Sequence, residues 1–388
     1  MNEIGKISIF NSEKSMAGKN HDEAAQKHLP LEVKRRHFLK GIGFIGAGAG
    51  AIFADHILNA NSEVEAAEVP ASSVTPTNST NTGEIPLRPL GKTGVKVSAI
   101  ALGGATLGQA KSKEEAIRIT QEAIDNGITF MDNAWEYNKH RSEEWMGEAL
   151  QGRRDKAFLM TKVCTHGRDR KVAMQQLEES LRRLKTDHLD LWQIHEVVYD
   201  NDPERIFRAN GAIEALDQAK KEGKVRFVGF TGHKDPAIHL KMLSYNYPFD
   251  AVQLPLNCFD ASFRSFERQV LPELNKRGIA VIGMKSLSGN ADAVKKGVVT
   301  PQEAIRYVMS LPIASLVSGI DSLKVLRQNL AIARGFQPMQ AKEMQALRDR
   351  CVQYATDGRF ELFKTSMKFD GDEGRIQHGF PPQSQVQT

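Results

Sequence analysis

Hydrophobic residues follow two alternating patterns along the chain from Ile85 onward. Short, nearly continuous apolar runs are typical of strands buried on both faces, and the longer segments between them have the period of amphipathic helices. The runs predict eight strands, at residues 97–102, 128–131, 157–163, 189–195, 225–231, 249–255, 279–284 and 315–319. The amphipathic segments predict helices at residues 113–126, 142–151, 170–184, 211–222, 236–244, 267–276, 301–309 and 322–333.

Eight strand–helix units in about 240 residues indicate an α/β protein with a closed (β/α)8 (TIM) barrel rather than an open doubly wound sheet. We place the barrel at residues 85–355 and a C-terminal tail at 356–388, which is polar enough to lie on the surface. The segment PLRPLGKTGVKV before the first unit fits a hairpin across the bottom of the barrel. In this fold the chemistry lies at the C-terminal ends of the strands, so candidate residues are sought there.

Residues 1–68 have the features of an export signal. The basic stretch KRRHFLK (34–40) precedes an apolar run rich in glycine and alanine (41–54) and then small residues, which is the order found in secretory signals. RRHFLK resembles the twin-arginine (Tat) motif, which predicts export of the folded protein by the twin-arginine translocation machinery to the periplasm or another extracytoplasmic site. A chance arginine pair in an unstructured tail is the alternative. Residues 69–84, rich in Pro, Ser, Thr and Asn, predict a flexible linker.

The same apolar run contains Gly41, Gly43 and Gly46 at the G-x-G-x-x-G spacing of dinucleotide-binding loops. That motif requires a strand directly before its first glycine, and here a basic stretch stands in its place. We therefore interpret these glycines as part of the signal.

Composition limits the other classes of function. The chain has 388 residues, 40% hydrophobic and 26% charged, which is a globular balance. Its net charge of +5, without a basic run beside aromatic residues, argues against a nucleic-acid partner. Three dispersed cysteines predict neither a disulfide framework nor a metal cluster. The apolar run at 41–54 is shorter than the ~20 residues of a membrane-spanning helix, so we expect no stable membrane insertion.

Four polar side chains fall at the ends of three consecutive predicted strands. Asp132 ends the second strand, Tyr137 follows it, Lys162 ends the third and His195 ends the fourth. A tyrosine hydroxyl is a weak acid, a nearby lysine ammonium favours its ionised form, and a carboxylate keeps that lysine charged. Together these groups predict proton transfer to an oxygen that becomes an alkoxide as its carbon receives hydride. Each residue alone fits a structural role equally well.

These residues lie in segments that resemble the aldo-keto reductase family. The segments are PLGKTGVKVSAIALGG, GITFMDNAWEY, FLMTKV, HLDLWQIH, GKVRFVGFTGH, FDAVQLPLN and VSGIDSLKVLRQN, in the order of the family. The resemblance implies an NAD(P)-dependent oxidoreductase that interconverts a carbonyl and an alcohol, with hydride from a nicotinamide cofactor. It implies Tyr137 as general acid/base, Lys162 and Asp132 as residues that tune the pKa of that tyrosine, and His195 as an orienting residue.

The resemblance also implies a cofactor site along strands five to eight. NADP-preferring relatives carry Arg or Lys where this chain has Asp321 and Val325, although Arg327 is close by. We therefore expect weakened selectivity for NADP, and the cofactor is either NADP or NAD. The predicted cofactor-binding residues are Thr231, Gln253, Met284, Lys285, Gly319, Ser322 and Asn329.

Residues in the loops above the four catalytic candidates are expected to contact the substrate. They are Trp135, His166, Glu196 and His233. This mixture of polar and aromatic side chains suits a small hydroxylated carbonyl compound, such as a sugar or a keto-glycoside.

Two other classes of function deserve comparison. His166, His195 and His233, with Glu196 adjacent, could in principle serve a metal-dependent barrel hydrolase, but the first strand ends in LGGAT without a ligand, so we predict no metal. The second alternative is a barrel that binds the cofactor without turnover, as a redox sensor or a partner-binding module. The complete set of four polar groups argues against it.

Overall fold

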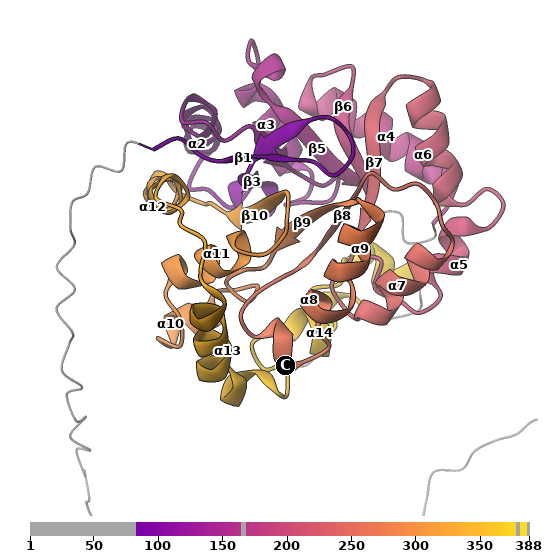
Figure 1. Cartoon of the computed structure of the whole chain (residues 1–388). Helices are drawn as coiled ribbons and strands as arrows, with labels where there is room; N and C mark the ends of the chain where they lie inside the picture. The colour runs from indigo at the N-terminus through magenta and orange to yellow at the C-terminus, as the bar shows by residue number, and fades with distance from the viewer. Residues whose placement is uncertain (1–82, 164–167, 378–380, 386–388) are drawn as a thin grey trace, which may run out of the picture. The chain divides into compact units, whose positions relative to one another are not determined.

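The centre of the molecule is a closed barrel of eight parallel strands in the order β10-β3-β4-β5-β6-β7-β8-β9 (Figure 1). The computed structural model describes residues 83–163, 168–377 and 381–385, all within a compact unit that spans residues 76–388. The predicted α/β class and (β/α)8 fold are confirmed. The barrel strands are β3 (Ile100–Gly103), β4 (Phe130–Asp132), β5 (Phe158–Val163), β6 (Leu189–Ile194), β7 (Val225–Thr231), β8 (Ala251–Pro255), β9 (Ala280–Met284) and β10 (Ser315–Gly319).

The first predicted strand is in fact two strands with different partners. β2 (Lys96–Ser98) pairs antiparallel with β1 (Leu87–Pro89), and only β3 enters the barrel. Leu90 and Val97 of this hairpin are fully buried against the apolar side chains inside the barrel, Phe130 among them. The expected hairpin is thus confirmed, and it covers the N-terminal end of the barrel, which faces the viewer in Figure 1.

A helix follows each barrel strand and packs on the outside of the barrel (Figure 1). These helices are α2 (Lys113–Asp125), α3 (Arg141–Ala149), α4 (Arg170–Leu184), α6 (Ala212–Lys221), α7 (Pro236–Ser244), α9 (Leu271–Arg277), α11 (Pro301–Met309) and α12 (Leu323–Arg334). Short helices that the sequence did not predict lie in the loops, namely α1 (Gly104–Leu107), α5 (Asp202–Phe207) and α10 (Asp292–Lys295). The predicted helix at 267–276 is divided into α8 (Phe266–Gln269) and α9, because Pro272 cannot donate a helical hydrogen bond.

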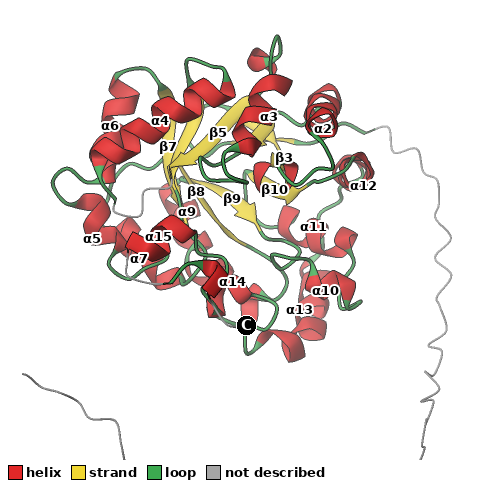
Figure 2. Ribbon diagram, turned by 180° about the vertical axis from the view of Figure 1, so that it is seen from behind, coloured by secondary structure: helices red, strands yellow, loops and turns green. Residues whose placement is uncertain are grey.

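The C-terminal segment is packed onto the barrel rather than lying loosely on its surface. It consists of α13 (Ala341–Ala355), α14 (Leu362–Thr365) and α15 (Asp372–Gln377). Phe363 is fully buried, and the buried ammonium of Lys364 lies 2.6 Å from Asp260 and 2.9 Å from Glu361. Because these charges are paired inside the protein, the polar composition of the segment does not mark an exposed tail. In Figure 2, on the side opposite Figure 1, α14 and α15 lie in front of the strands.

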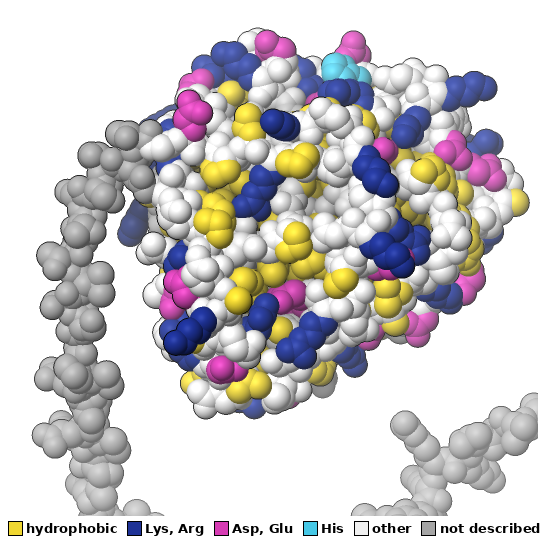
Figure 3. All heavy atoms as spheres, in the orientation of Figure 1, with side chains coloured by type: hydrophobic (Ala, Val, Ile, Leu, Met, Phe, Trp, Pro, Cys, Tyr) yellow, Lys and Arg dark blue, Asp and Glu magenta, His cyan; other side chains and the backbone are white. Residues whose placement is uncertain are grey.

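The surface of the barrel carries both signs of charge. In the face shown in Figure 3, Lys and Arg side chains are interspersed with Asp and Glu and with single hydrophobic groups. Within the described part of the chain, no helix has the length and hydrophobicity needed to cross a bilayer. The predicted signal at 1–68 and nearly all of the predicted linker at 69–84 lie outside the described residues.

Candidate functional site

The ends of strands β4, β5 and β6 bring the four catalytic candidates together. Asp132 is the last residue of β4, Lys162 lies near the end of β5, and His195 directly follows β6. The parallel register sets these ends side by side, because Asp132 aligns with Met160 in β5. Tyr137 reaches the same point from the loop between β4 and α3. The sequence pattern and the structure therefore place the same four side chains in one cluster.

The ammonium of Lys162 lies at the centre of this cluster. Its Nζ donates hydrogen bonds to Asp132 Oδ1 at 2.6 Å, to the backbone oxygen of Asn133 at 2.7 Å and to the hydroxyl of Tyr137 at 3.3 Å. Burial lowers the pKa of Lys162, and the negative charge of Asp132 opposes that effect. Three acceptors fix the direction of the lysine, so that it is held against the tyrosine hydroxyl.

The hydroxyl of Tyr137 lies between Lys162 and an imidazole. His195 Nε2 is 3.5 Å from the hydroxyl oxygen, and the two rings meet edge to face with centroids 5.5 Å apart. On the other side of the ring, His195 Nδ1 lies 2.8 Å from Glu136 Oε1. The tyrosine oxygen therefore has two nitrogen neighbours, which can stabilise its ionised form or supply it with a proton.

The backbone that carries His195 is held by a buried arginine. Arg168 donates to the carbonyl oxygen of His195 at 2.7 Å and to that of Glu196 at 2.6 Å. Its Nε and Nη2 atoms donate to the two carboxylate oxygens of Asp202, each at 2.9 Å. Glu196 has a positive φ of 49°, a conformation that non-glycine residues rarely adopt. Arg168 thus stabilises an unusual turn directly after His195.

A cavity of about 590 Å³ opens above Tyr137 and His195. Three of the four predicted substrate-contacting residues, Trp135, Glu196 and His233, line it, whereas His166 lies outside the described residues. Burial lowers the pKa of His233 well below its usual range, and Nδ1 of this imidazole lies 3.1 Å from the carbonyl oxygen of Phe363. A smaller cavity of about 340 Å³, lined by Lys92 and Arg277 among others, lies at the opposite end of the barrel.

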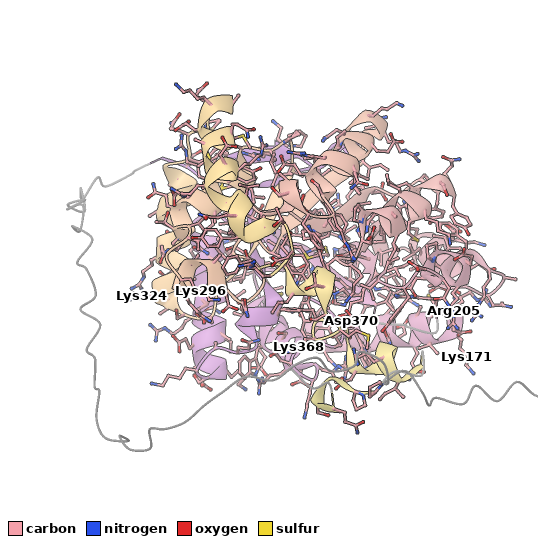
Figure 4. The ribbon with its side chains drawn as sticks, turned by 90° about the horizontal axis from the view of Figure 1, so that it is seen from below. Lys171, Arg205, Lys296, Lys324, Lys368 and Asp370 are labelled. Carbon is pink, nitrogen blue, oxygen red and sulfur yellow. The ribbon has the colours of Figure 1, made fainter. Side chains whose placement is uncertain are left out.

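The C-terminal segment forms one wall of the larger cavity. Lys368, Phe369, Gly371 and Asp372 line it, and Figure 4 labels Lys368 and Asp370 of this segment. The backbone N–H of Gly371 donates to Glu196 Oε2 at 2.7 Å, so the segment is hydrogen-bonded to the loop that follows His195. The C-terminal segment therefore helps to enclose the site.

Comparison with known proteins identifies the family of this barrel. The model of the Aldo/keto reductase family matches residues 99–291, the stretch that contains all four clustered side chains. The barrel is an aldo/keto reductase domain. NAD(P)-dependent oxidoreduction is the activity of this family.

Relatives of the aldo/keto reductase domain occur in bacteria, plants and fungi. An uncharacterized oxidoreductase of Bacillus subtilis, YqkF, is 26% identical and covers 69% of this chain and 96% of its own length. L-galactose dehydrogenase of Arabidopsis thaliana is 30% identical over 53% of this chain, which spans 66% of that protein. Among solved structures, the holo form of aldo-keto reductase AKR11C1 from Bacillus halodurans superposes with a TM-score of 0.58 at 22% identity, covering 69% of this chain and 96% of its own.

The residues expected to hold the cofactor divide into two groups on the aldo/keto reductase barrel. Near the tetrad of Asp132, Tyr137, Lys162 and His195, three of them line the cavity: Thr231, Met284 and Lys285. Gln253 is buried beside them, with its Nε2 3.4 Å from Asp132 Oδ1. Its Oε1 has no hydrogen-bond partner among the described residues, so it is an acceptor available to the amide of a nicotinamide ring.

Lys285 is enclosed by two aromatic rings of the C-terminal segment. Its ammonium lies 5.2 Å from the ring centroid of Phe363 and 4.9 Å from that of Phe369. Burial lowers the pKa of Lys285 to about 8. The side chain of Lys285 is therefore held between two rings at the wall of the cavity.

The second group, on β10 and α12, fits the adenosine end of a dinucleotide. Ser322 caps α12, Asn329 Nδ2 donates to Ser318 Oγ at 2.9 Å, and Gly319 lies at the end of β10. These three residues are not among those that line the cavity. Arg327, the cation close to Asp321 and Val325, is paired with Glu122 of α2 at 2.8 Å. Exposed Lys324, labelled in Figure 4, lies one turn earlier on the same helix.

Several contacts of the site were not predicted from the sequence. They are the approach of Glu136 to His195, the hydrogen bonds of Arg168 beneath the turn, and the bond from Gly371 to Glu196. Their partners are distant in sequence or in irregular loops, where hydrophobic periodicity gives no signal. Glu136, His195 and Glu196 also place possible metal-ligand atoms within 4.8 Å of one another, a grouping different from the histidines considered for a hydrolase.

Proposed function

We propose that the chain is an exported NAD(P)(H)-dependent reductase that interconverts a carbonyl and an alcohol, with Tyr137 as the general acid/base. The observation that carries this proposal is the position of the Tyr137 hydroxyl, 3.3 Å from Lys162 Nζ and 3.5 Å from His195 Nε2, at the wall of a cavity. A nicotinamide cofactor supplies the hydride when it is bound.

Each residue of the tetrad has a defined task in this reaction. In reduction, the Tyr137 hydroxyl gives its proton to the substrate oxygen as that oxygen gains negative charge. The Lys162 ammonium stabilises the phenolate that forms, and Asp132 holds Lys162 in place through the 2.6 Å ion pair. His195, on the opposite side of the hydroxyl, binds the substrate oxygen or returns a proton to the phenolate. In oxidation the same groups act in reverse.

The lining of the cavity favours a small hydroxylated carbonyl compound, such as a sugar or keto-glycoside. Glu136, Glu196 and His195 provide hydrogen-bonding groups, and Trp135 and Phe369 provide flat apolar surface. Sugars combine hydroxyl groups with apolar C–H faces, so they match such a mixture. The similarity to L-galactose dehydrogenase of Arabidopsis thaliana supports the same substrate class.

Export and cofactor preference complete the proposal. The sequence of residues 1–68 supports translocation by the twin-arginine route to the periplasm or another extracytoplasmic site. The pairing of Arg327 with Glu122 and the presence of Asp321 support use of NAD alongside or instead of NADP. Fractionation of cells that produce the full chain, with and without Arg35→Lys and Arg36→Lys together, tests export. Retention of the wild type in the cytoplasm would contradict it.

One assay tests the catalytic proposal. Purified protein is given NADH or NADPH and a panel of sugars, keto-sugars and simple aldehydes, and oxidation of the cofactor is followed by absorbance. Tyr137→Phe should lose turnover and keep cofactor binding, measured by fluorescence titration. Tyr245→Phe removes a phenol hydroxyl from an exposed tyrosine and should leave turnover unchanged. Turnover by Tyr137→Phe would refute the mechanism, and bound cofactor without turnover of any carbonyl would favour the binding-module alternative.

A further inference from the structure

We infer that His140 is a specificity-determining residue, whose imidazole Nε2 accepts a hydrogen bond from a hydroxyl group of the substrate. The inference rests on the proposed function, because it names the part of the cavity that recognises a hydroxylated carbonyl compound. His140 directly precedes α3, in the loop that carries Tyr137, and both residues line the same cavity. A substrate in this cavity can therefore contact both side chains.

The hydrogen bond at Nδ1 determines what the imidazole of His140 offers to a ligand. Nδ1 is hydrogen-bonded to the backbone carbonyl oxygen of Trp135 at 2.6 Å. A carbonyl oxygen can only accept, so Nδ1 is the donor and carries the proton. In the neutral imidazole Nε2 then holds a lone pair, and within the described part of the chain Nε2 has no hydrogen-bond partner. The half-buried ring therefore presents an available acceptor at the wall of the cavity.

The backbone at His140 has a conformation that favours glycine. Asn138, Lys139 and His140 have φ values of 55°, 56° and 72°, so three consecutive non-glycine residues are left-handed. Such residues store strain that surrounding contacts must offset. Asn138 Nδ2 donates to the carbonyl oxygen of Ala105 at 2.9 Å and to Ser142 Oγ at 3.1 Å, so this turn is also held by a side chain other than the imidazole. A histidine in place of glycine costs stability here, which indicates a use for its side chain.

Trp135 supplies an apolar surface beside this acceptor. The rings of Trp135 and His140 meet edge to face with centroids 4.4 Å apart, and both residues line the cavity. Trp135 Nε1 donates to Glu179 Oε2 at 2.8 Å, so the indole N–H is already bonded within the protein. Trp135 therefore offers apolar ring surface to a ligand, and His140 offers the hydrogen bond. This combination matches a sugar, in which C–H groups and hydroxyl groups lie side by side.

His140 could instead serve only to hold the backbone of Trp135, and one substitution separates the two roles. An asparagine amide can replace the Nδ1 donor and tolerates a positive φ, but it has no group at the position of Nε2. We expect His140→Asn to raise KM for sugars and keto-sugars by about 3- to 10-fold, as for the loss of one hydrogen bond, with kcat nearly unchanged. KM for simple aldehydes without hydroxyl groups should stay the same. Lys185→Asn, at an exposed position with a φ of 53° away from the cavity, is the matched control and should behave as wild type.

A second measurement does not depend on turnover. Calorimetric titration with the sugars and keto-sugars of the panel is carried out on Tyr137→Phe with NADH bound, and on the same variant with His140→Asn added. The added substitution should weaken the affinity by the same factor by which it raises KM. An equal rise in KM for sugars and simple aldehydes, an unchanged KM and affinity for sugars, or a loss of kcat alone would each overturn the inference. If no carbonyl is turned over, the proposed function fails, while the change in affinity still decides the role of His140.

Discussion

Lys162 donates one hydrogen bond to the carboxylate of Asp132 and another to the hydroxyl of Tyr137, at 2.6 and 3.3 Å. A single ammonium thus joins a buried negative charge to the hydroxyl that we propose as the general acid/base. Replacing Lys162 should affect stability and catalysis separately. Asp132 would stay buried without a counter-charge, and a phenolate at Tyr137 would lose its neighbouring positive charge.

Lys162→Met should lower kcat/KM by at least about 100-fold, since the phenolate of Tyr137 loses its neighbouring positive charge. The same change leaves Asp132 buried without a counter-charge and should lower the free energy of unfolding by about 3–5 kcal/mol. The double variant Asp132→Asn with Lys162→Met should recover much of that stability but none of the activity. Urea unfolding and steady-state kinetics measure the two effects, and recovery of activity in the double variant would count against the assignment.

Arg168→Met should destabilise the protein by about 3–5 kcal/mol, because Asp202 would remain buried without its bidentate partner. It should also lower kcat, since the backbone turn after His195 loses two hydrogen bonds. Arg170→Met is the matched control. Its partner Glu214 is 3.7 Å away and both side chains are largely exposed, so a change below about 1 kcal/mol is expected. Equal losses of stability for the two variants in thermal unfolding would contradict the role of Arg168 in pairing with Asp202 and holding the turn.

Glu122→Gln should increase affinity for NADPH by severalfold and leave affinity for NADH unchanged. The change releases Arg327 from its 2.8 Å ion pair and makes the guanidinium available to a 2′-phosphate. Glu114→Gln, on the exposed side of the same helix, should change neither constant. Fluorescence titration with both cofactors measures the dissociation constants. A parallel gain for NADH would mean that the effect is not at the 2′-phosphate.

The stability of the protein should depend on pH through Glu361, whose pKa burial raises from 4.5 to about 7. Between these two values the folded state holds a proton that the unfolded chain has lost, so the free energy of unfolding falls as pH rises through this window. The total contribution is up to about 3 kcal/mol. Glu361→Gln, which does not ionise, should gain stability relative to wild type on going from pH 5 to pH 8. The exposed substitution Asp349→Asn should show no such trend. A stability difference between Glu361→Gln and wild type that does not change with pH would show that Glu361 is not the source of the pH dependence.

The sequence predicted the barrel and the tetrad for the same physical reason. Parallel strands buried on both faces produce continuous apolar runs, and the residue that ends each run lies at the edge where the chemistry occurs, as Asp132 and Lys162 do. The run at 97–102 was misleading because buried Val97 and Ser98 of β2 lead directly into apolar β3, although the two strands belong to different sheets. Hydrophobic periodicity does not show that the chain leaves the hairpin and enters the barrel at Ala99.

The remaining parts of the site depend on contacts that periodicity does not encode. Glu196 and Gly371 are hydrogen-bonded although 175 residues separate them in the chain. Lys364 and Glu361 look like surface charges in the sequence, but their ion pairs are buried together with Asp260. The approach of Glu136 Oε1 to within 2.8 Å of His195 Nδ1 depends on the direction of one loop side chain, which composition and spacing leave undetermined.

The wall formed by Lys368, Phe369, Gly371 and Asp372 also has a consequence for the order in which the enzyme is assembled. During synthesis these residues leave the ribosome after all eight barrel strands, so the reactive side chains can meet before the cavity around them is complete. We therefore expect the cavity to be enclosed only after the C-terminal segment has docked, which makes this wall the last part of the site to form.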